Sequence, residues 1–224
     1  MAAAAHHPVV IAGAGPNGLM LACELALTGI QPVVLDALPV PSSEPKANGL
    51  VGQVVRMLDL RGLYTRFSGV DGPPRPSPTW MFSGMALDLS HSFTGTRANP
   101  MYLLAVPQPK LVRLLLERAA ELELTGFDAG DDGVVTAIRS ADGDYALAAD
   151  YLVGADGGRS IVRKTTGIAF PGTTAATVSR LAHVQIPEDL RAVDRSLQIP
   201  GFGRIAHGHN RFDNGLVLFG EVEP

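Results

Sequence analysis

The sequence predicts an α/β fold that opens with a strand, a glycine-rich turn, a helix and a second strand. Val9 to Ala12 form a short apolar run that ends at Gly13, and Val33 to Leu35 form another that ends at Asp36. Between these runs, apolar residues recur at helical spacing as far as Gly29, a residue type favoured just after a helix. Short apolar runs suit parallel strands that are buried on both faces. Together these observations predict a βαβ unit.

The turn after the first predicted strand carries three glycines in the pattern Gly13-x-Gly15-x-x-Gly18. In this pattern the first glycine allows a tight turn, the second lets the backbone approach a pyrophosphate, and the third lets helix and strand pack closely. The free N–H groups and the positive dipole end of the helix favour an anion. Asp36 follows near the spacing expected of a ribose acceptor. This context favours a dinucleotide site over a merely structural glycine turn, with the site residues Gly13, Gly15, Pro16, Asn17, Gly18 and Asp36.

Further along the chain, apolar spacing and proline positions predict the remaining elements. Four prolines between Asp71 and Pro78 exclude regular structure there. The other expected elements are a helix over 51–60, strand character over 80–89, a helix opened by Pro109 with a stripe at Leu111, Leu114, Leu115, Ala119 and Leu122, a strand over 134–139 between two acidic turns, a buried strand over 151–154, and sheet and loop from there to 224.

The predicted strand over 151–154 leads into Asp156-Gly157-Gly158. An aspartate at a strand end followed by two glycines places a carboxylate and exposed backbone at the edge of a sheet, where a cofactor would lie. A tight turn that caps a helix starting near Ser160 explains the same residues equally well. The residues by themselves leave both interpretations open.

Together these motifs resemble one family. The segment 151–172, YLVGADGGRSIVRKTTGIAFPG, is similar to the DG motif of class A flavoprotein monooxygenases, the FAD-dependent aromatic hydroxylases typified by p-hydroxybenzoate hydroxylase. The segment 46–64, KANGLVGQVVRMLDLRGLY, resembles the branch that acts on polyketides and rifamycin-like antibiotics. The resemblance covers essentially all of the chain.

This resemblance implies a Rossmann-like FAD-binding domain of the GR2 type, joined to part of a β-sheet substrate domain. It implies four segments, which are an FAD-binding βαβ lobe over 1–70, an excursion into the substrate lobe over 71–105, a return to the FAD-binding domain with the DG motif over 106–172, and the truncated start of a substrate-binding sheet over 173–224.

The resemblance also implies roles for individual residues. The glycine-rich turn would meet the FAD pyrophosphate and Asp36 the adenosine ribose. Lys46 stands where the family usually has an arginine near the cofactor. The lysine keeps the positive charge but lacks the planar set of N–H donors of a guanidinium. Gln108 matches a glutamine that contacts the ribityl region, and Asp156 would serve both FAD and NADPH.

The implied activity is an FAD- and NAD(P)H-dependent monooxygenase that hydroxylates a small aromatic or polyketide-type substrate with dioxygen, through a flavin C4a-hydroperoxide. The cofactor carries this chemistry, so we expect no catalytic side chain and no metal. The alternatives are a non-catalytic or incomplete FAD-binding fragment that needs a partner chain, and a related FAD reductase or halogenase. A homodimer and a completing partner chain both stay open.

Two departures from the family pattern stand out. Family members are longer and carry a second Gly-Asp motif, which is absent here and whose absence predicts weak retention of FAD. The chain also passes almost directly from the helix ending near Leu122 to Thr125-Gly126-Phe127, where relatives usually have an additional strand. We therefore expect a shortened, N-terminal form.

Composition restricts the remaining possibilities. A net charge of −4 and a pI near 5.8 argue against a nucleic-acid partner, because phosphate backbones are held by clustered Lys and Arg. Cys23 is the one cysteine, so an internal disulfide and a cysteine metal cage are excluded, and its place on the apolar helix face predicts a core residue. His207 and His209 are better explained as loop or surface residues than as a metal pair. No signal segment or membrane span is recognisable, which predicts a cytoplasmic protein without a membrane partner.

Overall fold

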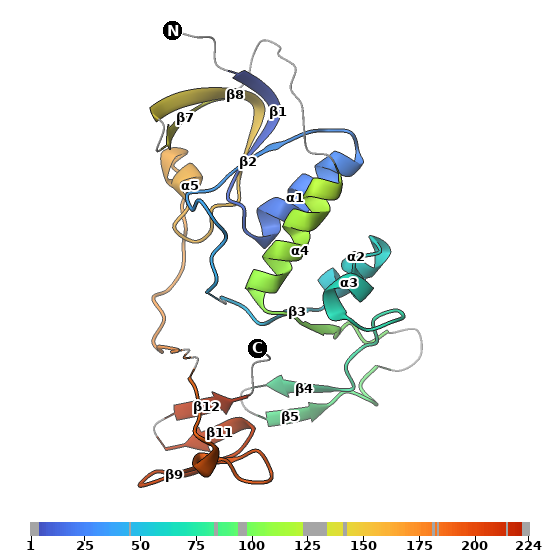
Figure 1. The fold of residues 1–224 in the computed structure, drawn as a ribbon, viewed down its shortest axis with the longest axis vertical. Helices are drawn as coiled ribbons and strands as arrows, with labels where there is room; N and C mark the ends of the chain where they lie inside the picture. The colour runs from blue at the N-terminus through green and yellow to red at the C-terminus, as the bar shows by residue number, and fades with distance from the viewer. Residues whose placement is uncertain are drawn as a thin grey trace. The chain divides into compact units, whose positions relative to one another are not determined.

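The computed structural model divides the chain into two compact units, and most of their elements are labelled in Figure 1. Unit 1 comprises residues 1–75 and 102–171, and unit 2 comprises residues 76–101 and 172–224. The residues that the structure describes are 5–44, 46–82, 85–93, 98–122, 134–140, 143–180, 182, 184–213 and 215–220.

Unit 1 is built on a four-stranded sheet in the order β2-β1-β8-β7. Its strands are β1 (Ala5–Ala12), β2 (Val33–Leu35), β7 (Val134–Ser140) and β8 (Gly143–Gly154). Strand β1 pairs in parallel with both β2 and β8, and β7 runs antiparallel to β8. The expected strands are confirmed, and β8 begins eight residues before the expected Tyr151 because it pairs with β7 as well as with β1. The expected burial of residues 151–154 is wrong, since Tyr151 is 70% exposed, Gly154 is exposed, and the two residues between them are only partly buried.

Strand β1 begins four residues before the apolar run that predicted it, and over 9–11 it is buried on both faces, as that run predicts. Val9 and Ile11 pack with Ala22 of helix α1 (Pro16–Leu27), whereas Val10 packs with Leu147 on the other face. The helix ends as expected, with Thr28 as its C-cap and Gly29 in the left-handed region at a φ of +83°. The strand–turn–helix–strand order confirms the predicted α/β class and its Rossmann-like βαβ unit.

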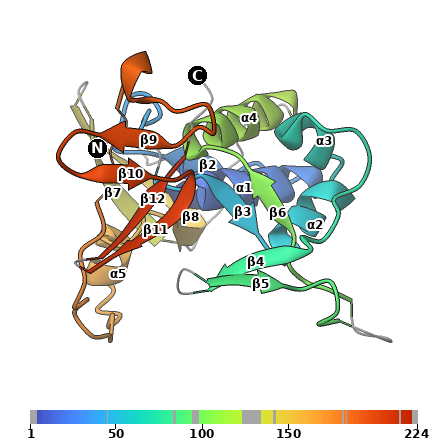
Figure 2. The ribbon, with the colours of Figure 1, turned by 90° about the horizontal axis from the view of Figure 1, so that it is seen from below.

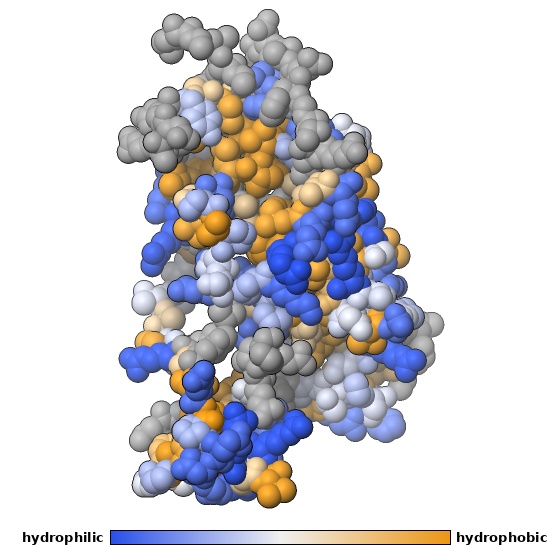
Figure 3. Space-filling model, in the orientation of Figure 1, coloured by the Kyte–Doolittle hydropathy of each residue, from blue (hydrophilic) through white to orange (hydrophobic). Residues whose placement is uncertain are grey.

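Helix α4 (Gln108–Glu121) packs against α1 and carries the largest core cluster of unit 1. Its predicted stripe is buried at Leu111, Leu114, Leu115 and Ala119, and the cluster extends to helices α2 (Gln53–Leu60) and α3 (Tyr64–Ser68). The outward side of α4 is the hydrophilic area over this helix in Figure 3. There the guanidinium of Arg66 in α3 pairs with Glu117 at 2.9 Å and with Glu121 at 2.6 Å.

A small sheet in unit 1 was not predicted. Strand β3 (Gly49–Val51) pairs antiparallel with β6 (Leu103–Ala105), so that Val51 lies opposite Leu103. The helix expected over 51–60 therefore starts at Gln53, because Val51 belongs to this strand pair. Strands of three residues show no alternation that a sequence pattern can reveal.

The described residues of unit 2 form three antiparallel strand pairs and one short helix, seen from below in Figure 2. Its elements are β4 (Thr79–Phe82) with β5 (Met85–Asp88), the 3-10 helix η1 (Glu188–Leu190), β9 (Leu197–Ile199) with β10 (Gly203–Ile205), and β11 (Gly208–Phe212) with β12 (Gly215–Phe219). The stretch over 80–89, expected to have strand character, forms a hairpin of two strands.

The proline-rich stretch over 71–78 contains no helix or named strand, as expected. Thr125 to Phe127 and the acidic turn before β7 lie outside the described residues, so the expected shortening there stays a prediction. Among the residues that are described, no helix is both long enough and apolar enough to span a bilayer.

Candidate functional site

Most of the predicted site residues lie at the edge of the unit 1 sheet where the parallel strands β1, β2 and β8 end. The amide of Gly13 donates to the carbonyl of Leu35, the last residue of β2, at 2.6 Å. The amide of Ala155, just after β8, donates to the carbonyl of Ala12 at 2.7 Å. The glycine-rich turn is therefore held between the ends of its two neighbouring strands, which is the edge where α/β sheets bind ligands.

Two of the three glycines are required by packing within the protein. Gly13 has a φ of +112°, and a Cβ there would lie 2.4 Å from the carbonyl oxygen of Ala155. A Cβ on Gly18 would lie 1.9 Å from the carbonyl oxygen of Gly13 and 3.3 Å from Ile11. Both positions would clash with backbone, so any larger residue must displace the turn. Gly13 and Gly18 are explained by the fold alone.

Gly15 differs from the other two glycines. A Cβ at Gly15 would meet nothing within 4 Å, and Gly15 has an ordinary extended conformation with a φ of −75° and a ψ of 177°. As the N-cap of α1, Gly15 has no side chain to bond the first amides of the helix, and no acidic residue lies in the first turn. Pro16 has no N–H, while Asn17 is exposed beside it. Open space and uncapped amides are what an approaching diphosphate needs.

Asp36 lies next to this turn, although 22 residues separate it from Ala14. Its Oδ2 accepts a hydrogen bond from the amide of Ala14 at 2.7 Å, and its Oδ1 accepts one from the amide of Leu38 at 2.9 Å. Both carboxylate oxygens of Asp36 thus bind backbone amides. The sequence indicated the position of Asp36 but not its contact with Ala14, because no local pattern records a hydrogen bond across 22 residues.

Asp156 lies on the other side of the turn and caps the short helix α5 (Ile161–Thr165). Its Oδ2 accepts hydrogen bonds from the amides of Ile161 at 2.6 Å and Val162 at 3.3 Å. Its Oδ1 is buried and has no hydrogen-bond partner among the described residues. Burial raises the pKa of Asp156, but the Ser160 hydroxyl and the two amides lower it more, so the pKa lies below its ordinary value and the group is a carboxylate at neutral pH.

Ser160 completes the cap of α5. Its hydroxyl accepts a hydrogen bond from the amide of Arg163 at 3.0 Å, and its residue is buried. Arg163 in turn donates to the carbonyl of Gly158 at 2.9 Å and lies over the ring of Phe170 at 4.5 Å from its centroid. The helix start near Ser160 is confirmed, whereas the contributions of Ser160 and Arg163 to the DG turn were missed. A serine three residues before the amide that it caps is the sequence signal for such a helix start.

Lys46 and Gln108 form a second group within unit 1. Lys46 is exposed, and Gln108 is the partly buried first residue of α4. The amide of Gln108 donates to the carbonyl of Ala47 at 2.9 Å, and the amide of Val106 donates to Asn48 at 3.1 Å. These bonds place the backbone beside Lys46 against the start of α4. In the part of the chain that the structure describes, no hydrogen bond connects this group to the glycine-rich turn.

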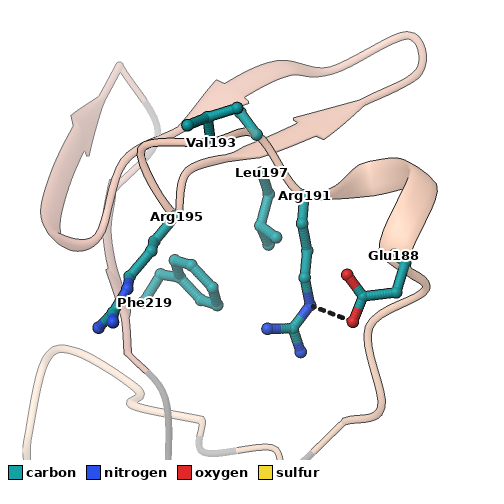
Figure 4. A pocket seen from close by; sticks show the side chains of 7 residues that line it. Glu188, Arg191, Val193, Arg195, Leu197 and Phe219 are labelled. Atoms are coloured by element: carbon teal, nitrogen blue, oxygen red, sulfur yellow. Dashed lines mark ion pairs between the residues drawn. The ribbon is translucent and has the colours of Figure 1, made fainter.

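Unit 2 has a pocket of its own, of about 290 Å³, shown in Figure 4. The ring of Phe219 and the side chain of Leu197 lie between two arginines, Arg191 and Arg195. The Nε of Arg191 lies 4.0 Å from the carboxylate of Glu188. The lining includes none of the residues that the sequence singled out.

Cys23 has the core role that the sequence predicts, and His207 and His209 lie at the surface as expected, although His209 belongs to strand β11 and not to a loop. Cys23 is buried, its Sγ lies 3.8 Å from the carbonyl of Leu115, and burial raises the pKa of its thiol. His207 and His209 are exposed. Within the described residues, no cluster of three or more histidine, cysteine, aspartate or glutamate side chains is arranged to hold a metal ion.

Comparison with known proteins identifies the relatives of this chain. A family model described as an FAD binding domain matches residues 6–201. The chain is 39% identical over 192 residues to 12-dehydrotetracycline 5-monooxygenase/anhydrotetracycline 6-monooxygenase of Streptomyces rimosus. The matched region covers 82% of this chain and 37% of that protein. It is 36% identical to a rifampicin monooxygenase of Streptomyces venezuelae over 80% of this chain and 37% of that protein.

Among solved structures, the chain is similar to OxyS anhydrotetracycline hydroxylase from Streptomyces rimosus, with a TM-score of 0.63 and 41% identity over 75% of this chain and 35% of that one. These relatives confirm the resemblance to aromatic hydroxylases of the polyketide and rifamycin branch. The chain spans 37% of the length of the curated relatives described above.

Proposed function

The chain belongs to the FAD binding domain family, and from that premise we propose that unit 1 holds the diphosphate of FAD on its glycine-rich turn, in the service of an aromatic monooxygenase reaction. The observation that carries the proposal is the contrast among the three glycines. Packing accounts for Gly13 and Gly18 but not for Gly15, whose surroundings are open. A ligand that approaches the backbone closely explains why a side chain is missing at that position.

The amides and charges around Gly15 fit a diphosphate. Helix α1 presents the amides of its first turn without a side-chain cap, and its dipole adds partial positive charge there. We assign the pyrophosphate to Gly13, Gly15, Pro16, Asn17 and Gly18, and the adenosine ribose to Asp36, whose oxygens retain lone pairs beyond their two amide bonds.

Three further residues complete the proposed cofactor site. The buried Oδ1 of Asp156 is an acceptor without a partner, and a hydroxyl of a bound cofactor is a suitable donor for it. Gln108 at the start of α4 would bind the ribityl region, and the exposed Lys46 would supply positive charge near the cofactor. NADPH is the proposed reductant, with Asp156 also contributing to its binding.

When bound, FAD would supply an acceptor for the electrons of a nicotinamide and a means of activating dioxygen, so that one oxygen atom is transferred to an aromatic ring. The side chains of this chain bind and orient the cofactor, and the proposal assigns no catalytic side chain. The relatives named above are monooxygenases of 12-dehydrotetracycline, anhydrotetracycline and rifampicin, so the proposed substrate class is an electron-rich aromatic or polyketide-type molecule.

The first test is a titration of the purified chain with FAD, in which binding is measured by the quenching of flavin fluorescence. We expect Gly15→Val to weaken FAD binding by about 30-fold or more, because a branched side chain would occupy the space that the diphosphate needs. Gly172→Val is the matched control, since a Cβ at Gly172 also meets nothing within 4 Å and its φ is not positive. Equal FAD affinity of the two variants would contradict the proposal. The affinity of the unchanged chain also measures the weak retention that the sequence predicts.

The second step tests the reaction. The FAD-loaded chain is incubated with NADPH and an anhydrotetracycline-type substrate, and products are analysed by mass spectrometry. A gain of one oxygen atom by the substrate supports monooxygenation. NADPH consumption with hydrogen peroxide as the only product would instead support an oxidase or an incomplete FAD-binding fragment.

A further inference from the structure

We propose that Asp36 is a positioning residue that holds the glycine-rich turn in its ligand-binding shape before any nucleotide arrives. This inference rests on the proposed function of that turn. It goes beyond a contact with the ribose, because the carboxylate of Asp36 already binds the protein backbone at two points. One of these points, the amide of Ala14, lies between the first two glycines of the turn.

The bonds of Asp36 link three parts of the site. Oδ2 accepts from Ala14 in the turn, and Oδ1 accepts from Leu38 in the segment that follows β2. The neighbouring residue Leu35 accepts the amide of Gly13 at 2.6 Å. Two consecutive amides of the turn, those of Gly13 and Ala14, are therefore fixed to the end of β2. This leaves the amides of the first turn of α1 as the donors that face a ligand.

Electrostatics supports a positioning role. A carboxylate next to a turn that receives a diphosphate repels the diphosphate, so its charge alone would weaken binding. The proposal therefore requires that the hydrogen bonds accepted by Asp36 contribute more to binding than this repulsion costs. Among the described residues, nothing lies within 4 Å of where a Cβ at Gly15 would be, and a turn that is ordered in advance loses less conformational entropy on binding.

The experiment separates a positioning role from a ribose contact by using two nucleotides. ADP and 2′,3′-dideoxy-ADP, which lacks both ribose hydroxyls, are titrated into the unchanged protein and into Asp36→Ala. We expect the variant to weaken binding of dideoxy-ADP by about tenfold, the effect of losing one charge-assisted hydrogen bond, and binding of ADP by at least as much, because ADP also loses the ribose contact proposed for Asp36. If Asp36 served only the ribose, the affinity for dideoxy-ADP would not change, and the proposal would be wrong.

A second measurement needs no ligand. Amide hydrogen exchange at Ala14 in the nucleotide-free protein should be about tenfold faster in Asp36→Ala and less affected in Asp36→Asn, which keeps one acceptor oxygen. Asp71→Asn is the charge control, because it removes one negative charge from an exposed loop position of unit 1. Unchanged protection of Ala14 in Asp36→Ala would overturn the proposal.

The two measurements also keep this inference apart from the proposed function. If the unchanged protein bound neither ADP nor FAD, the proposed function would fail, whereas the exchange rate of Ala14 would still decide whether Asp36 fixes the turn. Circular dichroism and the melting temperature of Asp36→Ala establish that β2 and the rest of unit 1 remain folded.

Discussion

The two turns at the carboxyl ends of strands β1 and β8 in unit 1 have the same construction, but they differ in whether side chains cap the helix that follows. Each follows a parallel strand and opens a helix, the first after β1 and the second after β8. The first leaves the start of α1 uncapped, because Gly15 has no side chain. The second satisfies the start of α5 with its own side chains, Asp156 and Ser160.

This difference separates the roles of the two turns. An uncapped helix start needs an external partner for its amides, so the first turn is suited to an anion. A capped start needs none, so what the second turn offers is the buried Oδ1 of Asp156, an acceptor for a hydroxyl or an N–H donor. The second turn also supports the first, because Ala155 packs directly against Gly13.

The largest effect expected from this comparison is on folding of the first turn. Gly18→Ala places a Cβ 1.9 Å from the carbonyl oxygen of Gly13, so we expect a loss of about 3 kcal/mol or more in the free energy of unfolding. Gly15→Ala adds the same methyl group in open space and should cost no more than about 1 kcal/mol. Urea denaturation of the two variants provides the measurement. Similar losses in both would mean that Gly15, too, is required by packing.

A smaller effect is expected in the second turn. Ser160→Ala removes the acceptor for the amide of Arg163 and should lower the free energy of unfolding by about 1 kcal/mol, as for other N-caps. Thr166→Ala, at the opposite end of α5, removes an exposed hydroxyl and should change it by less than about 0.5 kcal/mol. If thermal melts showed no difference between these variants, self-capping would not be what stabilises the second turn.

The smallest expected effect is a loss of stability at acidic pH. The pKa of Asp156 in the folded protein lies below its value in the unfolded chain, which is about 3.9. Its contribution to stability is therefore fully present above that value and is lost as the pH falls through the folded pKa. Between about pH 5 and about pH 3, which lie on either side of the unfolded pKa, the melting temperature of the unchanged protein should fall more than that of Asp156→Asn. Parallel curves for the two proteins would show that Asp156 makes no such contribution.

Much of the site could be predicted because its signals are local. The strand, the three glycines, the helix and the second strand with Asp36 lie within 36 consecutive residues, and each follows from periodicity or from a backbone requirement. The signal for the start of α5 near Ser160 was equally local. Strand β3 and its partner β6 were not, because their pairing joins segments about fifty residues apart and each strand has only three residues.

The sequence by itself determined the class of the fold, the glycine-rich turn and the pair of aspartates at strand ends, since these depend on residue type and spacing along the chain. Only the tertiary structure decided that Asp36 binds the amide of Ala14, that Gly13 packs against Ala155, and that Gly15 has space around it. The physical reason is distance along the chain. Hydrogen bonds and close contacts between residues that are far apart in sequence exist only once the strands have paired, so no local pattern records them.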